Sequence, residues 1–95
     1  MEYNLPDRVV RDISLFAGIH GVERILLFGS RARGNYTERS DIDIAVYGGD
    51  FDAFYWDIKE KAHTLLSFDV VDAKNMSEEL KTEIQRDGII IYEKA

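Results

Sequence analysis

Residues 27–34 have the sequence Leu-Phe-Gly-Ser-Arg-Ala-Arg-Gly, and residues 40–46 have the sequence Ser-Asp-Ile-Asp-Ile-Ala-Val. The first stretch leads from an apolar run into a glycine–serine turn, a pattern typical of a strand followed by a short helix. In the second stretch Asp41 and Asp43 alternate with aliphatic residues. Because successive side chains of a strand point to opposite faces, the two carboxylates share one face. We therefore expect a strand with one acidic face and one face buried in a core.

The rest of the chain alternates between helical and strand-like patterns. Apolar spacing, capping residues and glycine breaks predict helices at residues 7–17, 30–33, 51–66 and 78–86, and strands at 22–28, 41–46, 68–71 and 89–92. This alternation predicts an α/β (α+β) fold, with a mixed β-sheet flanked by helices. The polar connection between the first two strands is short, which leaves room for antiparallel pairing there. Residues 1–95 are long enough for a single domain with a hydrophobic core.

The composition is that of a globular protein with an excess of acidic residues. Apolar residues make up 45% of the chain, and the formal net charge is -6. An acidic chain repels a long polyanion over most of its surface, so we expect no binding of long nucleic acids. The basic residues before position 47 are all arginines, which can bind a single triphosphate locally. Those in or beside the quoted stretches are Arg31, Arg33 and Arg39.

Cysteine is absent from the sequence, which excludes disulfides, thiolate metal sites and a cysteine nucleophile. Residues 1–4 lack a basic region that leads into an apolar one, so the sequence predicts no secretory leader. The apolar runs at residues 25–28 and 89–92 are too short to span a bilayer. These features together predict a soluble, cytoplasmic protein that does not enter a membrane.

Two common phosphate-binding motifs do not fit the glycine turn. The spacing from Gly29 to Gly34 matches the start of a P-loop, but Asn35 and Tyr36 stand where that loop needs a lysine and a serine or threonine. A dinucleotide-binding fingerprint needs a second glycine two positions after Gly29, where this chain has Arg31. Both motifs are therefore excluded.

A third pattern fits the same residues. Ten residues separate Gly29-Ser30 from the Asp-x-Asp pair, and this spacing resembles the signature of the polymerase-beta-type nucleotidyltransferase superfamily. The sequence Gly-Ser-Arg-Ala-Arg-Gly, followed by Ser-Asp-Ile-Asp, resembles the minimal branch of that superfamily. The members of this branch are small prokaryotic proteins that act beside HEPN-domain partners in toxin–antitoxin pairs. The resemblance extends to residues 68–71 and more weakly to 87–92. It implies a polymerase-beta-like fold, ATP as substrate, and a HEPN-type toxin partner whose tyrosine accepts adenylate, with this chain as the antitoxin.

The resemblance also implies a two-metal site for Mg²⁺. Two such ions about 4 Å apart can bind the attacking and leaving oxygens of a phosphoryl transfer, and Mg²⁺ prefers oxygen ligands. Asp41 and Asp43 are the expected ligands from one strand. A carboxylate from a neighbouring strand completes such a site, and Asp69 is the candidate because it lies within the strand-like residues 68–71, whereas Asp72 follows them. Asp69 would bind metal or act as the general base toward the acceptor hydroxyl.

The glycine turn supplies the expected phosphate contacts. Gly29 permits a tight turn and a close approach of the backbone, and Ser30 offers its hydroxyl and the first amides of a helix. The resemblance makes Arg31 and Arg33 nucleotide-binding residues as well. Because they are two positions apart on a short helix, they point in different directions, so one of them could instead only brace the acidic strand.

Other interpretations of the same residues stay open. Asp41 and Asp43 could form the solvated face of an edge strand, although their spacing from the glycine turn favours the nucleotide site. The protein could be a catalytically silent antitoxin that neutralises its partner by contact. It could also be a small-molecule nucleotidyltransferase of the antibiotic type, for which 95 residues leave little room. The four aromatic residues within 51–56 exceed one helical stripe, so some could stay exposed and bind a partner or a second copy of the chain.

Overall fold

The structure, a computed structural model, describes residues 5–95, so residues 1–4, which bear on the prediction of no leader, lie outside the described residues. In chain order the elements are α1 (Asp7–Ile19), β1 (Arg24–Phe28), α2 (Ser30–Arg33), β2 (Ile42–Tyr47), α3 (Phe51–Lys61), β3 (Phe68–Asp72), the 3₁₀-helix η1 (Ala73–Asn75), α4 (Glu78–Asp87) and β4 (Ile89–Glu93). Within this described part, no helix combines the length and apolarity needed to cross a membrane. The predicted order of helices and strands is confirmed.

The strands form one mixed sheet in the order β3-β2-β1-β4. β1 is antiparallel to both of its neighbours, whereas β2 and β3 run parallel to each other. The antiparallel β1–β2 pair needs only the short connection through α2, and the parallel β2–β3 pair is joined by the crossover helix α3. The mixed sheet expected from the sequence is therefore confirmed, including the antiparallel pairing of its first two strands.

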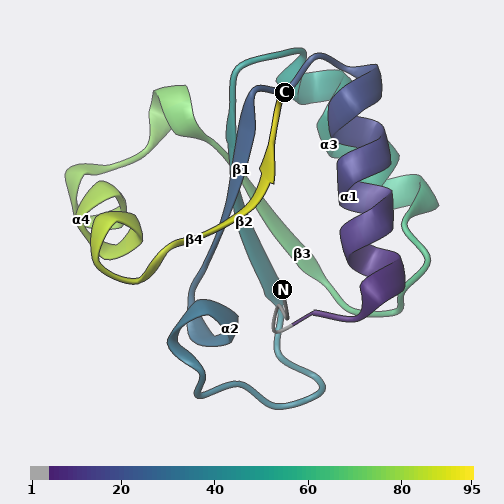
Figure 1. Cartoon of the computed structure of the whole chain (residues 1–95). Coiled ribbons are helices and arrows are strands. Elements are labelled where there is room, and N and C mark those ends of the chain that lie inside the picture. The colour runs from purple at the N-terminus through teal and green to yellow at the C-terminus, as the bar shows by residue number, and fades with distance from the viewer. Residues whose placement is uncertain (1–4) are drawn as a thin grey trace.

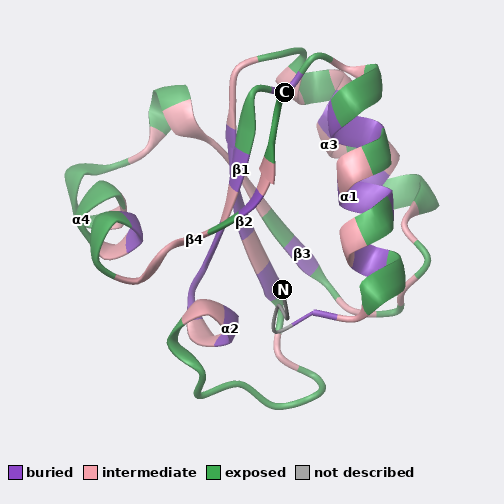
Figure 2. Ribbon diagram, viewed as in Figure 1, coloured by how far each residue is buried: buried purple, intermediate pink, exposed green. Residues whose placement is uncertain are grey.

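Helices cover the two faces of the sheet unequally (Figure 1). α1 and α3 pack on one face, and the main core between them and the sheet includes Ile44 and Phe54. α4 lies on the opposite face, over a smaller core formed by Phe28, Ala45 and Ile84. Figure 2 shows buried segments along the sheet and on α1 and α3, while α4 is mostly exposed. The side of β2 that carries Ala45 is therefore the less covered one.

The third helix is shorter than predicted. Apolar spacing predicted helix through residue 66, but the chain leaves α3 at Ala62, which has an extended backbone with a ψ of 137°. The backbone N–H of His63 donates a 2.7 Å hydrogen bond to Oδ2 of Asp12 in α1. The carbonyl of His63 accepts a 2.7 Å hydrogen bond from Nε of Arg8, also in α1. These contacts satisfy backbone groups that a longer helix would have hydrogen-bonded within itself. Tertiary contacts with α1 are therefore the reason why α3 ends early.

The aromatic residues of α3 are buried to different degrees. Phe54 lies fully within the core, Phe51 and Tyr55 are half-buried, and Trp56 is 58% exposed. The prediction that some of these rings remain exposed is confirmed. Binding of a partner or of a second copy of the chain through Trp56 stays a prediction.

Candidate active site

Strand pairing brings the predicted carboxylates together. β2 and β3 are parallel, and their register places Asp43 directly opposite Asp69. Residues two apart in a strand share a face, so these side chains lie on the face that carries Ala45 and Val71 of the smaller core. Asp41 stands one residue before β2, and its charge raises the pKa of Asp43, so the two carboxylates lie near each other. The fold thus gathers Asp41, Asp43 and Asp69 at the amino-terminal ends of two adjacent strands.

The electrostatic environment of Asp43 reflects this crowding. Burial is the largest cause of the raised pKa of Asp43, which reaches about 6 instead of 3.8. Neighbouring carboxylates raise this pKa further, in the order Asp69, Asp41 and Glu83, while Arg33 acts in the opposite direction. Like charges that share a site favour the neutral form of one of them. A carboxyl group shifted in this way is typical of functional sites.

The donor set fits Mg²⁺ in its chemistry. This ion takes oxygen ligands, and Asp41, Asp43 and Asp69 supply carboxylate oxygens from one face of the sheet. A bound cation would also relieve the mutual repulsion that raises the pKa of Asp43. Within residues 5–95, no three acidic, histidine or cysteine side chains converge closely enough to form a metal centre by themselves. Asp41 and Asp69 are exposed, so a cation can reach their carboxylates from solvent.

The glycine turn lies directly against Asp43. Phe28, the last residue of β1, pairs with Asp43 across the antiparallel β1–β2 ladder, and Gly29 follows it. Gly29 has a φ of 73°, which favours glycine, and a Cβ atom at this position would overlap the Asp43 carboxylate. Ser30, half-buried, then begins α2. The turn predicted to bind phosphate and the carboxylate predicted to bind metal are therefore in contact.

Arg31 braces the loop that leads into β2. Its side chain is only 3% exposed. The guanidinium donates hydrogen bonds to the backbone carbonyls of Ser40 at 3.1 Å, Glu38 at 3.2 Å and Thr37 at 3.4 Å. It also lies 5.1 Å from the centre of the Tyr36 ring, within range of a cation–π contact. Arg31 therefore has the bracing role that the sequence left open for one of the two arginines, and its binding of nucleotide stays a prediction.

Arg33 points instead toward α4. Its Nη1 atom lies 3.4 Å from Oε2 of Glu83, and the two side chains are 38% and 31% exposed. Glu83 raises the pKa of Asp43 and Arg33 lowers it, so this ion pair lies close to the carboxylates. Sequence analysis did not identify Glu83 because no motif surrounds it on α4. Only the packing of α4 against the sheet brings it to the site.

β3 runs one residue further than predicted and includes Asp72. The prediction that the strand ends before Asp72 is therefore wrong. Strand alternation nevertheless puts Asp72 on the face opposite to Asp69. Its carboxylate accepts a 3.1 Å hydrogen bond from the backbone N–H of Lys74 and caps η1. Asp72 thus has a local structural role away from Asp43.

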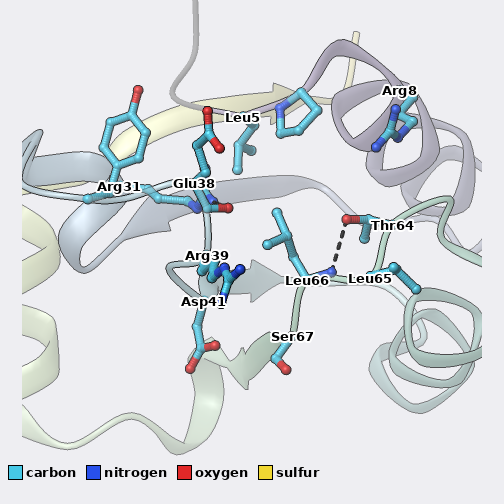
Figure 3. Close-up of a pocket in the computed structure, with 12 residues that line it drawn as sticks. Leu5, Arg8, Arg31, Glu38, Arg39, Asp41, Thr64, Leu65, Leu66 and Ser67 are labelled. Carbon is cyan, nitrogen blue, oxygen red and sulfur yellow. Dashed lines mark hydrogen bonds between the residues drawn. The ribbon is translucent and has the colours of Figure 1, made fainter.

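A cavity of about 760 Å³ adjoins the Asp41 end of the site (Figure 3). Leu66 and Arg39 are among its lining residues, and Asp41 contributes to its wall. Neither Asp43 nor Asp69 lines it. A volume of this size lies within the range of small-molecule sites. Its size keeps the alternative of a small-molecule transferase open.

Comparison with known proteins identifies the family. Residues 13–95 match the family model described as polymerase beta, nucleotidyltransferase. The chain belongs to that family. The match covers the glycine turn, both acidic strands and α4, and it confirms both the resemblance found in the motif and the polymerase-beta-like fold.

A curated relative of this polymerase beta family member has a closely similar segment. A candidate protein adenylyltransferase of Methanocaldococcus jannaschii is 62% identical over 32 residues, which are 33% of this chain and 32% of that protein. The similar segment thus spans about a third of the relative.

Solved structures share the nucleotidyltransferase fold over most of the chain. A chain in a crystal structure of a toxin–antitoxin complex with AMP-PNP superposes with a TM-score of 0.71 at 25% identity, covering 90% of this chain and 73% of that one. A second match comes from the tri-AMPylated Shewanella oneidensis HEPN toxin in complex with an MNT antitoxin. It has a TM-score of 0.54 at 26% identity, and it covers 77% of this chain and 58% of that one.

Proposed function

We propose that this nucleotidyltransferase transfers adenylate from ATP to a tyrosine hydroxyl of a HEPN-type toxin and thereby acts as the antitoxin of that toxin in the cytoplasm. The observation that carries the proposal is the contact between the Gly29 turn and the Asp43 carboxylate, with Asp69 opposite on β3. The adenylyltransferase description of the archaeal relative and the AMPylated toxin of the Shewanella complex support the choice of adenylate and of the partner.

The proposal gives the residues of the glycine turn the task of binding the triphosphate. Gly29 lets the backbone approach the phosphates, and Ser30 donates its hydroxyl to a phosphate oxygen. Arg33, which is partly exposed beside the carboxylates, neutralises part of the phosphate charge. Arg31 contributes mainly by holding the loop before Asp41 in place.

The transfer itself is a substitution at the α-phosphorus of ATP. The acceptor oxygen bonds to that phosphorus, the bond to the oxygen bridging the β-phosphorus breaks, and pyrophosphate leaves. In this proposal Asp69 takes the proton of the acceptor hydroxyl, or else shares in binding metal with Asp41 and Asp43. When bound, Mg²⁺ ions held by these carboxylates would screen them from the triphosphate and stabilise charge on the leaving group.

Intact-mass analysis of the co-purified partner tests the proposal. The protein is purified with the product of the adjacent gene, stripped with EDTA, and incubated with ATP in the presence or absence of Mg²⁺. We expect the partner to gain the mass of one or more adenylates only when both ATP and Mg²⁺ are present. Asp43→Asn should abolish this gain. Asp72→Asn, the same change on the opposite face of β3, should leave it intact.

Three outcomes would contradict parts of the proposal. A partner that binds without any change in mass would favour a silent antitoxin that acts by contact. If no protein partner binds and a small hydroxyl compound is labelled instead, the protein is a small-molecule transferase, with the cavity beside Asp41 as its acceptor site. Equal labelling in EDTA would contradict the requirement for Mg²⁺.

A further inference from the structure

Glu83 is fixed at the site by the packing of its helix. Its neighbour Ile84 is buried in the smaller core with Phe28 and Ala45. Phe28 immediately precedes the Gly29 turn, so the same core that seats α4 also supports the turn. The Glu83 side chain itself is 31% exposed, which leaves its carboxylate accessible to solvent beside α2.

The Glu83 carboxylate pairs with Arg33, the arginine to which the proposed function assigns part of the triphosphate charge. Oε2 of Glu83 lies 3.4 Å from Nη1 of Arg33, with a hydrogen bond between them. A triphosphate that reaches Arg33 therefore meets an arginine that already has a carboxylate partner. Because both groups are partly exposed and the separation is long, the ion pair is weak and can be exchanged.

We propose that Glu83 is a positioning residue that occupies Arg33 while the site is empty and gives it up to the terminal phosphates of a nucleoside triphosphate. This inference rests on the proposed function, because it assumes that ATP is the substrate. The exchange makes binding depend on the number of phosphates. A monophosphate lacks the terminal phosphates that would displace Glu83, whereas a triphosphate replaces the lost ion pair with new contacts to Arg33. Glu83 thus weakens the binding of every nucleotide that engages Arg33.

The exchange predicts an unusual gain of affinity when a charged site residue is removed. Glu83→Gln should tighten the binding of ATP by about two- to fivefold, as expected for removing one exposed competing ion pair, and leave the binding of AMP unchanged. Arg33→Gln should weaken ATP binding. In the double variant, Glu83→Gln should tighten ATP binding less than it does alone, since its competition with the phosphates acts through Arg33.

Calorimetric titration of the protein with ATP, ADP and AMP in Mg²⁺ measures these effects. Glu60→Gln is the matched control, because it removes the same charge from an exposed position of α3 on the other face of the sheet. This control should bind all three nucleotides as the parent does. In the labelling assay, Glu83→Gln should lower KM for ATP and keep kcat, a split that a general loss of structure would not produce.

Defined results would overturn the inference. ATP binding by Glu83→Gln that is unchanged or weaker than in the parent would contradict the exchange, as would equal tightening for AMP. An effect of Glu83→Gln that is just as large in the Arg33→Gln background would show that Glu83 acts by another route. If the parent binds no ATP, both the proposed function and this inference are wrong. If the parent binds ATP and Glu83→Gln leaves nucleotide binding unchanged, only this inference is wrong.

Discussion

Replacement of Asp43 by asparagine should abolish transfer and at the same time stabilise the fold at neutral pH. The folded protein raises the pKa of Asp43 from 3.8 to about 6, chiefly by burial and then by neighbouring carboxylates. A difference of about 2 pKa units corresponds to about 3 kcal/mol against ionisation in the folded state. Because the side chain is only partly buried, solvent screening reduces this to about 2 kcal/mol. An uncharged asparagine does not incur this cost of ionisation.

The size of this stabilisation depends on pH in a defined way. Below about pH 4 the folded and unfolded chains both keep the proton on Asp43, so parent and variant should have similar stability. Between about pH 4 and pH 6 the unfolded chain loses this proton first, so the stability of the parent falls as the pH rises. Above that range the full difference should be present. The advantage of Asp43→Asn therefore grows from near zero to about 2 kcal/mol across this window.

Urea unfolding followed by the fluorescence of Trp56 measures the difference. In EDTA at about pH 8 the variant should unfold at a urea concentration about 1–2 M higher than the parent, and at about pH 4 the two midpoints should nearly coincide. Asp52→Asn, an exposed change on α3, is the matched control and should show no such growth with pH. A variant that is less stable than the parent at pH 8, or equally shifted at both pH values, would refute the electrostatic reasoning. Transfer at the parental rate would refute the assigned role.

Four further substitutions probe the surroundings of this carboxylate. Gly29→Ala should lower the free energy of unfolding by about 1–2 kcal/mol and abolish transfer, because the added methyl group would overlap Asp43 and residue 29 has a positive φ. A variant that is fully active in the labelling assay and fully stable in urea would contradict the close contact. Arg31→Lys should lower the free energy of unfolding by about 1–3 kcal/mol and speed proteolysis within residues 35–40, since lysine cannot satisfy the carbonyls that the guanidinium binds. Unchanged cleavage would argue against the brace. Asp69→Asn should remove most transfer while Asp72→Asn removes little, and the reverse result in rate measurements would mean that Asp72 faces the site.

Local sequence patterns were sufficient for most of the fold. Glycine breaks, capping residues and apolar spacing predicted the order of the elements, because these signals act over a few residues of chain. In the structure, Asp50 and Ser77 cap α3 and α4. The end of α3 was predicted wrongly for a related reason. The hydrogen bond from His63 to Asp12 in α1 ends the helix, and no local pattern reports a partner so distant in sequence.

For the site, the sequence by itself determined that Asp41 and Asp43 share one face, because strand alternation has a fixed period of two. It also determined that a glycine turn precedes them at a fixed distance along the chain. Only the tertiary structure decided that Asp69 stands opposite Asp43 and that Gly29 touches its carboxylate, because strand register depends on pairing between segments far apart in the sequence. The packing of α4 likewise decided the place of Glu83, since a helix face acquires its neighbours only when the core beneath it forms.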